Sequence, residues 1–539
     1  MREEILGFFR DIWPESYHIE DVPFILGYKG EEIQAYFSVL HELEEEGCIR
    51  IKGGEYGSYQ KTEDTKLIGI YKASKKGFGF VIPSEGNLPD VFIPNGCAGT
   101  AMHDDEVEYI IKRKGTSERN AEGIIRRVVT RNTTRVVGIF ERLPKSGFVT
   151  PHNERLGEDI YIPLECTMDA RSGATVVVEL TAWPEEHRKA EGKIVEIVGD
   201  SSTPDLDVLS VMATFDLPKE FPKDVQEEAR KISFTVTEGA DRLDLRHQEM
   251  ITIDGEDAKD LDDAVHAKVL DNGNIELGVH IADVSHYVPA GSIIDQEAYR
   301  RGTSVYLVDR VIPMLPVELS NGICSLQAKE DRYAMSCIME VNPHGKVVHY
   351  TIKPSIIHIT RRCSYKEIYL ALEENIIPDD LAPLMEMVRT LETLAYQLMK
   401  MRQQAGAISF EFPEYKVLLD GMGTPQRIVR KDRTIAEKLI EQCMLLANET
   451  VATFLSERLD TSIYRIHEDP KDTKIEQLIT VLHHSGYPVK LPSKVEPKHI
   501  EELLQSVSGT EIEPVVQIMV LRSMQQAKYS SEHIGHFGL

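Results

Sequence analysis

The sequence contains 539 residues, of which 42% are hydrophobic, and it carries a formal net charge of -27. The length suffices for several domains with large cores, whereas the negative charge excludes a protein that coats nucleic acid through a uniformly basic surface. Any contact with nucleic acid must be confined to a groove or channel. The seven scattered cysteines, without a Cys-x-x-Cys pair, indicate a reduced, cytoplasmic protein, and the absence of a long apolar run predicts no membrane partner.

The N-terminal residues predict a small helical module that ends in a hairpin. Apolar residues recur at helical spacing over 3–9 and 31–46, and a hairpin is expected over 48–59. Helices followed by a two-stranded ribbon are typical of a winged-helix domain, here residues 1–62. Such modules bind nucleic acid or protein, and the acidic end of the second helix argues against base recognition by this element.

Residues 66–200 contain an internal repeat. Two segments of the first copy, Gly69-Ile-Tyr71 and Asp90-Val-Phe-Ile-Pro94, recur at one shared offset as Gly138-Ile-Phe140 and Asp159-Ile-Tyr-Ile-Pro163. Between them, glycine and aromatic residues alternate as on the strands of cold-shock barrels. The repeat therefore predicts two cold-shock domains with the OB fold, residues 66–132 and 134–200.

The first barrel is predicted to bind RNA through Phe78 and Phe80. Strand alternation places both rings on one face, where unpaired bases stack on them, and Lys76 lies close enough in sequence to contact phosphate. An alternative for such rings is the barrel core, and we expect this alternative for Phe148 in the second copy.

The remainder of the chain predicts a linker and a mixed domain. The linker, 201–239, contains a helix at 225–231. Strands at 275–279 and 348–352 and later long helices then predict a mixed α/β domain over 240–539. The helices are expected at 381–403, 433–459, 475–484 and 500–507. The expected fold class is thus a multidomain α+β protein with a winged helix, two OB-type β-barrels and a mixed α/β domain.

Four carboxylates cluster behind the β-prone run 251–253: Asp254, Asp260, Asp262 and Asp263. They repel one another unless cations neutralise them, and an oxygen-only ligand set suits Mg²⁺. Two-metal hydrolysis of a phosphodiester is the chemistry that such a site permits.

Other interpretations of this cluster remain open at this point. A run of aspartates is often a solvated acidic loop. An EF-hand is excluded because Ala264 and Val265 occupy its third-ligand and glycine positions. The segment Asp254-Gly-Glu256 also matches the short Asp-x-Glu motif of a different exonuclease superfamily, which predicts that Glu256 is essential.

Longer motifs narrow these alternatives. The chain resembles the ribonuclease II (RNB) family in Thr252–Val265, His280–Tyr287, Arg301–Leu307, Arg310–Pro316 and Leu319–Leu326. The resemblance implies a processive, two-magnesium 3′-to-5′ exoribonuclease. By this resemblance, we expect the protein to degrade single-stranded RNA and, in its full-length form, structured RNA to nucleoside 5′-monophosphates.

The resemblance also implies roles for single residues. Asp254, Asp260 and Asp263 match metal ligands, and Asp262 matches the residue that completes the second metal site or orients water. Tyr306 and Phe410 match the aromatics that stack on the bases at the 3′ end. His280, Asp283 and His467 lie in family-like motifs and are expected to be structural hydrogen-bonding residues.

The resemblance also implies binding partners for the protein and further segments after the catalytic domain. The resemblance implies a monomer that binds single-stranded RNA 3′ ends, with the ribosome or other proteins of RNA decay as further candidate partners. In the family, an arginine-containing segment and an RNA-binding OB domain follow the position of Leu539, so the catalytic domain is expected to be incomplete. The alternative function is an RNA-binding module that cleaves little or not at all, because those arginines stabilise developing charge.

Overall fold

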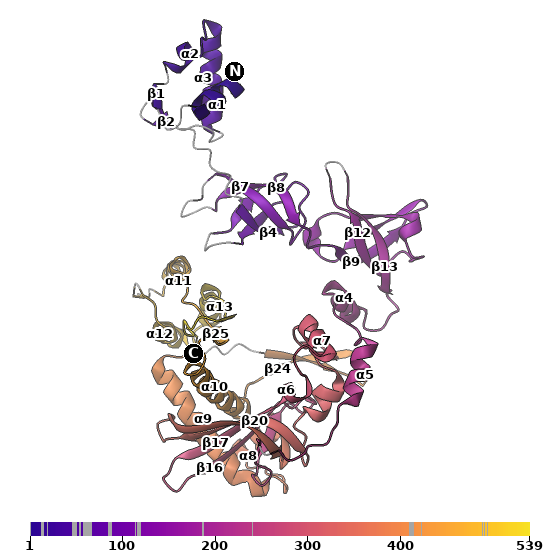
Figure 1. The fold of residues 1–539 in the computed structure, drawn as a ribbon, viewed down its shortest axis with the longest axis vertical. Coiled ribbons are helices and arrows are strands. Elements are labelled where there is room, and N and C mark those ends of the chain that lie inside the picture. The colour runs from indigo at the N-terminus through magenta and orange to yellow at the C-terminus, as the bar shows by residue number, and fades with distance from the viewer. Residues whose placement is uncertain are drawn as a thin grey trace. The chain divides into compact units, whose positions relative to one another are not determined.

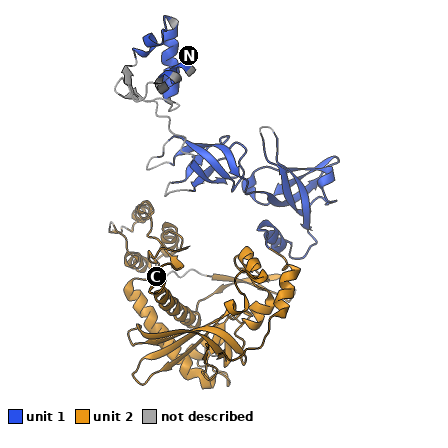
Figure 2. Cartoon of the chain, in the orientation of Figure 1, with its two compact units in different colours: residues 1–217 blue, residues 218–539 orange. Residues whose placement is uncertain are grey.

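The computed structural model describes the whole chain except residues 1, 12–15, 19, 46–50, 53–54, 58–66, 85–88, 114, 116–119, 186–187, 240, 409–413, 422, 488, 490, 493 and 539. The chain forms two compact units, residues 1–217 and 218–539 (Figure 2). Among the described helices, none is both long enough and apolar enough to cross a membrane.

The N-terminal part of the first unit consists of helices and a three-stranded sheet of order β1-β3-β2 (Figure 1). Tyr36, Leu40 and Leu43 recur on one face of the second long helix and pack against Ile5 and Val22. The winged-helix assignment stays a prediction, and the turn of its hairpin lies outside the described residues. The elements are α1 (Arg2–Asp11), β1 (Ser16–His18), α2 (Val22–Ile25), α3 (Glu31–Glu45), β2 (Ile51–Lys52) and β3 (Glu55–Gly57).

The repeat forms two closed β-barrels with the same strand connections. The first contains β4 (Leu67–Ala73), β5 (Gly79–Pro83), β6 (Val91–Ile93), β7 (Glu106–Arg113) and β8 (Glu122–Thr130). The second contains β9 (Arg135–Arg142), β10 (Ser146–Pro151), β11 (Ile160–Pro163), β12 (Thr175–Ala182) and β13 (Glu191–Gly199). The two barrels predicted from the repeat are thereby confirmed.

Equivalent glycines show why the sequence pattern repeats. A Cβ on Gly79 would lie 2.3 Å from the ring of Tyr71, and one on Gly147 would lie 2.2 Å from the ring of Phe140. Both positions need glycine because an aromatic core residue of the neighbouring strand covers the backbone. Helix α4 (Leu206–Thr214), at the start of the expected linker, packs on β9 and β13 of the second barrel.

The second unit is built on a seven-stranded sheet of order β14-β21-β20-β17-β16-β15-β22. Neighbouring strands are antiparallel except for the parallel pairs β14–β21 and β15–β22. The strands are β14 (Leu243–Asp244), β15 (Ile251–Asp254), β16 (Asp263–Val269), β17 (Ile275–Ala282), β20 (Asp331–Val341), β21 (Val347–His358) and β22 (Arg361–Ser364).

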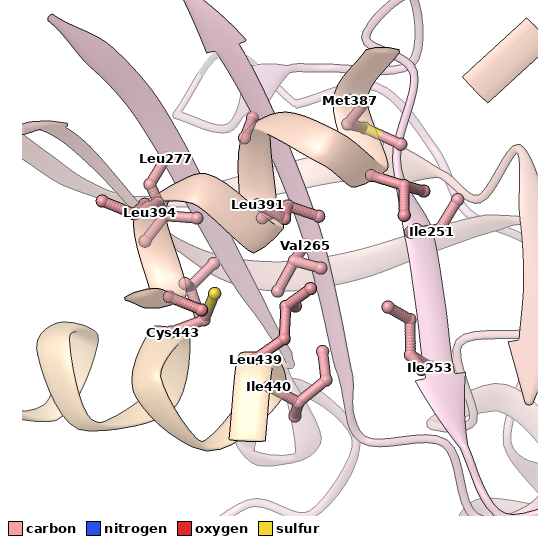
Figure 3. Close-up of a cluster of buried hydrophobic side chains, with 14 of the residues drawn as sticks. Ile251, Ile253, Val265, Leu277, Met387, Leu391, Leu394, Leu439, Ile440 and Cys443 are labelled. Carbon is pink, nitrogen blue, oxygen red and sulfur yellow. The ribbon is translucent and has the colours of Figure 1, made fainter. Parts of the chain in front are cut away.

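Two long helices cover one face of this sheet (Figure 3). Leu391 and Leu394 of α9 (Met385–Ala405) and Leu439 of α10 (Ile435–Ser456) meet Val265 and Leu277 of the strands. All five side chains are buried, and each contributes roughly 1.5–3 kcal/mol relative to an exposed position. The helices predicted over 381–403 and 433–459 are thus confirmed, and they hold the strands that carry the aspartates.

The other elements of the second unit surround this core. The helices predicted near 225, 475 and 500 are confirmed as α5 (Lys223–Lys231), α11 (Asp472–His484) and α12 (Pro497–Val507). Further elements are α6 (Val284–Tyr287), α7 (Ile293–Arg301), β18 (Val305–Tyr306), β19 (Val311–Ile312), α8 (Tyr365–Glu373), β23 (Glu414–Leu419), β24 (Pro425–Lys431), β25 (Tyr464–Ile466), α13 (Glu513–Ser523) and β26 (Lys528–Ser530).

Candidate active site

The four aspartates lie where the chain passes from β15 into β16, two neighbouring strands inside the sheet. Asp254 is the last residue of β15 and Asp263 the first of β16, while Asp260 and Asp262 lie in the connecting loop. The two strands pair antiparallel through Ile251 and Val265, so the loop returns the chain to the point where β15 ended. The structure therefore brings together the four carboxylates that the sequence singles out.

Burial and charge repulsion together raise the pKa values of two of these carboxylates. Burial, followed by the charges of Asp262 and Asp254, raises the pKa of Asp263 to about 7. Although the side chain of Asp262 is exposed, the pKa of its carboxyl is also raised, first by partial loss of water and then by Asp254 and Asp260. Each ionised aspartate makes ionisation of the next one harder.

The site fits a hard cation in its chemistry. Oδ2 of Asp263 is buried and has no hydrogen-bond partner among the residues that the structure describes, which is costly for a carboxylate unless a cation compensates it. Within the described residues, no three His, Cys, Asp or Glu side chains by themselves enclose a point that could hold a metal ion. Mg²⁺ does not need such a cage, because it is bound by one or two carboxylates together with water and substrate phosphate.

Tyr306 joins this cluster from the β18–β19 hairpin. Its hydroxyl donates a 2.8 Å hydrogen bond to Oδ2 of Asp260, and this bond is the main reason that the pKa of Tyr306 rises to about 12. The side chain is nevertheless 66% exposed, so the ring face is available for stacking. Phe410, the other aromatic expected here, lies outside the described residues.

Tyr365 is a member of the cluster that sequence reasoning missed. It begins α8, directly after β22, and Asp254 is paired in register with its neighbour Ser364. Burial and then the charges of Asp254 and Asp263 raise the pKa of its hydroxyl strongly. The pairing of β15 with β22 brings this tyrosine to the aspartates, and no local sequence pattern predicts that contact.

The histidines and Asp283 of the family-like motifs all have hydrogen-bond partners, and their structural role stays a prediction. His280 is fully buried and bonds through Nε2 to His266 Nδ1 at 2.9 Å and through Nδ1 to Ser336 Oγ at 2.6 Å. Asp283 accepts a 2.7 Å hydrogen bond from Arg242. Nε2 of His467 lies 2.9 Å from the carbonyl oxygen of Gln525.

The first barrel, in the other unit, carries an aromatic cluster. Phe78 and Phe80 are half-buried, with ring centroids 6.1 Å apart, and Phe92 lies within 5.6 Å of both. Lys76 is exposed on the turn that precedes Phe78. Sequence reasoning missed Phe92 as a candidate, although it alternates with the buried Val91 and Ile93, which was the available signal.

The expectation that Phe148 belongs to the core of the second barrel is wrong. Its strand neighbours Gly147 and Val149 are buried, so alternation turns Phe148 outward, where it is half-buried. Its ring lies 5.7 Å from that of Tyr161 and 5.8 Å from Nζ of Lys189. The second barrel therefore keeps a smaller version of the aromatic face of the first.

Family models match both barrel regions and the second unit. Residues 242–539 match the RNB domain, residues 148–222 a cold shock domain, and residues 69–128 the ribonuclease B OB domain. The OB-type barrels and the mixed α/β RNB domain of the expected fold class are thereby confirmed.

Similar proteins agree with this assignment. Ribonuclease R 1 of Lactococcus lactis is 38% identical over 100% of this chain and 68% of its own length. Ribonuclease R of Thermotoga maritima is 40% identical over 93% of this chain and 71% of its own length.

Solved structures of Mycoplasma genitalium RNase R give the same result. The complex with ribose-methylated single-stranded RNA has a TM-score of 0.81 and 25% identity, and covers 88% of this chain and 75% of that one. The complex with double-stranded RNA has a TM-score of 0.72 and 26% identity, and covers 76% and 74%. The chain therefore belongs to the RNB family of 3′-to-5′ exoribonucleases, in which it is homologous to ribonuclease R.

Proposed function

We propose that this chain hydrolyses single-stranded RNA processively from the 3′ end to nucleoside 5′-monophosphates, with Mg²⁺ as its cofactor. One observation carries the proposal: four aspartates of an RNB domain meet where β15 ends and β16 begins, and the buried Oδ2 of Asp263 has no hydrogen-bond partner in the described part of the chain. Bound Mg²⁺ supplies an activated water and stabilises charge on the leaving oxygen.

Each aspartate has a defined role in this proposal. By the resemblance to the RNB family, Asp254, Asp260 and Asp263 hold the metal. Asp254 and Asp263 lie on two paired strands and Asp260 on the loop that joins them, which supports this assignment. Asp262 completes the metal site or orients the attacking water. Its exposed side chain suits a group that meets solvent and substrate.

In this proposal RNA is held by aromatic rings. Tyr306 stacks on the bases beside the scissile bond, and its 66% exposed side chain next to Asp260 supports this role. Phe410 is proposed as the second aromatic at the 3′ end. Phe78, Phe80 and Lys76 form a separate contact for single-stranded RNA on the first barrel.

The proposed domains follow the sequence. They are a winged helix over 1–62, cold-shock barrels over 66–132 and 134–200, a linker over 201–239 and the RNB domain over 240–539. The Mycoplasma genitalium relative has been solved with single-stranded and with double-stranded RNA. We extend single-stranded RNA to this chain as its substrate, and structured RNA to the full-length protein.

The proposal is tested with a 5′-labelled, single-stranded RNA and a DNA of the same sequence. Labelled RNA should shorten from its 3′ end with Mg²⁺ and stay intact with EDTA. The DNA should stay intact in both, because it lacks the 2′-hydroxyl that distinguishes RNA. RNA that is bound but not shortened in Mg²⁺ would contradict the proposal and support the alternative of an RNA-binding module.

A further inference from the structure

The loop between β15 and β16, residues 255–262, is held at its main chain by one arginine. Nη2 of Arg362 lies 3.3 Å from the carbonyl oxygen of Gly255, 3.0 Å from that of Glu256 and 2.7 Å from that of Ala258. Arg362 belongs to β22, where it is paired in register with Thr252 of β15. The guanidinium therefore links the strand beside the loop to the first half of the loop.

A serine holds the second half of the loop. The hydroxyl of Ser325 accepts a 3.2 Å hydrogen bond from the main-chain nitrogen of Leu261 and donates a 2.8 Å bond to the carbonyl oxygen of Lys259. Ser325 is only 1% exposed, so water cannot readily replace these bonds. The main-chain nitrogen of Leu326 also donates to the carbonyl oxygen of Leu261 at 2.8 Å.

We propose that Arg362 and Ser325 are positioning residues that fix the carboxylates of Asp260 and Asp262 against those of Asp254 and Asp263. A loop with two aspartates next to two more is driven outward by repulsion, and hydrogen bonds to its main chain oppose this movement. These bonds leave the carboxylates free for a cation. The inference rests on the proposed function, in which these carboxylates bind Mg²⁺.

The geometry explains why an arginine is used. All three bonds come from Nη2, which the rigid, planar guanidinium holds in a fixed direction toward the loop, whereas a lysine ammonium is a compact charge on a flexible stem. Replacing Arg362 by lysine keeps the charge and removes this arrangement. Any resulting change in metal affinity is then due to the position of the loop.

Arg361 provides a matched control on the same strand. Its Nε donates to Asp380 at 2.8 Å, its Nη2 to Glu367 at 2.9 Å and its Nη1 to the main-chain carbonyl oxygen of Arg362 at 3.3 Å, so its side chain holds the start of α8, the chain near Asp380 and its own strand. It makes no recorded contact with the described residues of the 255–262 loop. Arg361→Lys therefore tests the general cost of losing a strand arginine.

The experiment measures binding of Mn²⁺ alone to the metal-free full chain, by electron paramagnetic resonance of the free ion and without RNA. Arg362→Lys and Ser325→Ala should each weaken Mn²⁺ binding, on the order of tenfold, as loss of outer contacts to metal ligands does elsewhere. Arg361→Lys should bind Mn²⁺ as the parent does. The Mg²⁺ concentration for half-maximal RNA shortening should rise in the same two variants.

Several outcomes decide the inference. Unchanged Mn²⁺ affinity in Arg362→Lys and Ser325→Ala would overturn it, and so would a parent chain that binds no Mn²⁺. Thermal unfolding of the metal-free variants identifies misfolding, and if Arg362→Lys unfolds, Ser325→Ala alone decides. A parent chain that binds Mn²⁺ but leaves RNA intact contradicts only the proposed function, since the comparison of affinities still supports or overturns the positioning role.

Discussion

Tyr306 and Asp260, separated by 46 residues in sequence, are joined by a hydrogen bond of 2.8 Å between the phenolic hydroxyl and Oδ2. The contact connects the side chain proposed to stack on bases with a carboxylate proposed to hold Mg²⁺. RNA positioning and metal binding therefore meet at this one pair of side chains.

Substitutions of Tyr306 separate its ring from its hydroxyl. Tyr306→Phe should retain RNA affinity because the ring remains, whereas Tyr306→Ala should lose about 1–3 kcal/mol of binding free energy, the usual contribution of one base–aromatic stack. The measurement is fluorescence anisotropy with a labelled single-stranded RNA in EDTA. Equal losses in both variants would show that the hydroxyl, and not the ring, supports binding.

Removal of one charge from the cluster should stabilise the metal-free protein. At about pH 8 the Asp263 carboxyl, whose pKa is about 7, is ionised next to Asp254 and Asp262, so Asp263→Asn should raise the free energy of unfolding by on the order of 1 kcal/mol. Mg²⁺ should raise the melting temperature of the parent and leave that of the variant unchanged. If the variant is less stable than the parent without metal, charge repulsion at Asp263 does not destabilise the metal-free protein.

Glu256 tests the competing Asp-x-Glu interpretation. Its carboxylate lies 3.6 Å from Nζ of Lys366 and is exposed, unlike that of Asp263. Glu256→Ala should therefore shorten RNA at the parent rate and change stability by no more than about 0.5 kcal/mol, as surface substitutions usually do. Loss of nuclease activity in a folded Glu256→Ala protein would favour the other exonuclease chemistry.

Burial of His280 makes part of the stability depend on pH. Loss of water, followed by the charge of His266, holds the pKa of His280 well below 6.5. The unfolded chain binds this proton more readily, so the neutral imidazole contributes stability above about pH 6.5 that is lost as the pH falls, by up to about 1.4 kcal/mol per pH unit.

The pH dependence of this contribution can be measured as the difference in stability between the parent chain and His280→Gln. His280→Gln should cost about 1–3 kcal/mol near pH 7, because buried partners such as Ser336 lose a hydrogen bond, and the cost should shrink toward about pH 5. Chemical denaturation of the parent and of His280→Gln at the two pH values measures it. Glu276, with a pKa of about 2, does not titrate in this range. A cost that is constant or larger at the lower pH would contradict a depressed pKa.

The sequence predicts those parts of the fold that depend on local patterns. Alternation of buried and exposed residues on β5 and β10, together with the repeat, predicts the barrels, and the apolar spacing of α9 and α10 predicts the helices over the sheet. Phe148 shows the limit of this reasoning. Because Phe148 is the single aromatic residue in this part of the second copy, we expected it in the barrel core. The two-residue period of the strand instead turns its side chain outward.

In the candidate site, too, some residues can be recognised from the sequence and others only from the structure. The aspartates lie within ten residues of one another, so their repulsion can be recognised from sequence. Tyr365 and Arg362 follow them by about a hundred residues and reach the loop only because β22 pairs with β15. Ser325 belongs to a third segment, between β19 and β20. Such contacts depend on sheet topology, which no local pattern specifies.

The most direct test of the central claim compares the parent chain with Asp262→Asn. Released nucleoside 5′-monophosphates are measured by chromatography with single-stranded RNA in Mg²⁺, while RNA affinity is measured in parallel. Because the substitution removes charge but little volume, the variant should bind RNA as the parent does and release monophosphates at least about a hundredfold more slowly, a difference of about 2.7 kcal/mol in the barrier. Release of monophosphates by Asp262→Asn at the parent rate would contradict hydrolysis at this aspartate cluster.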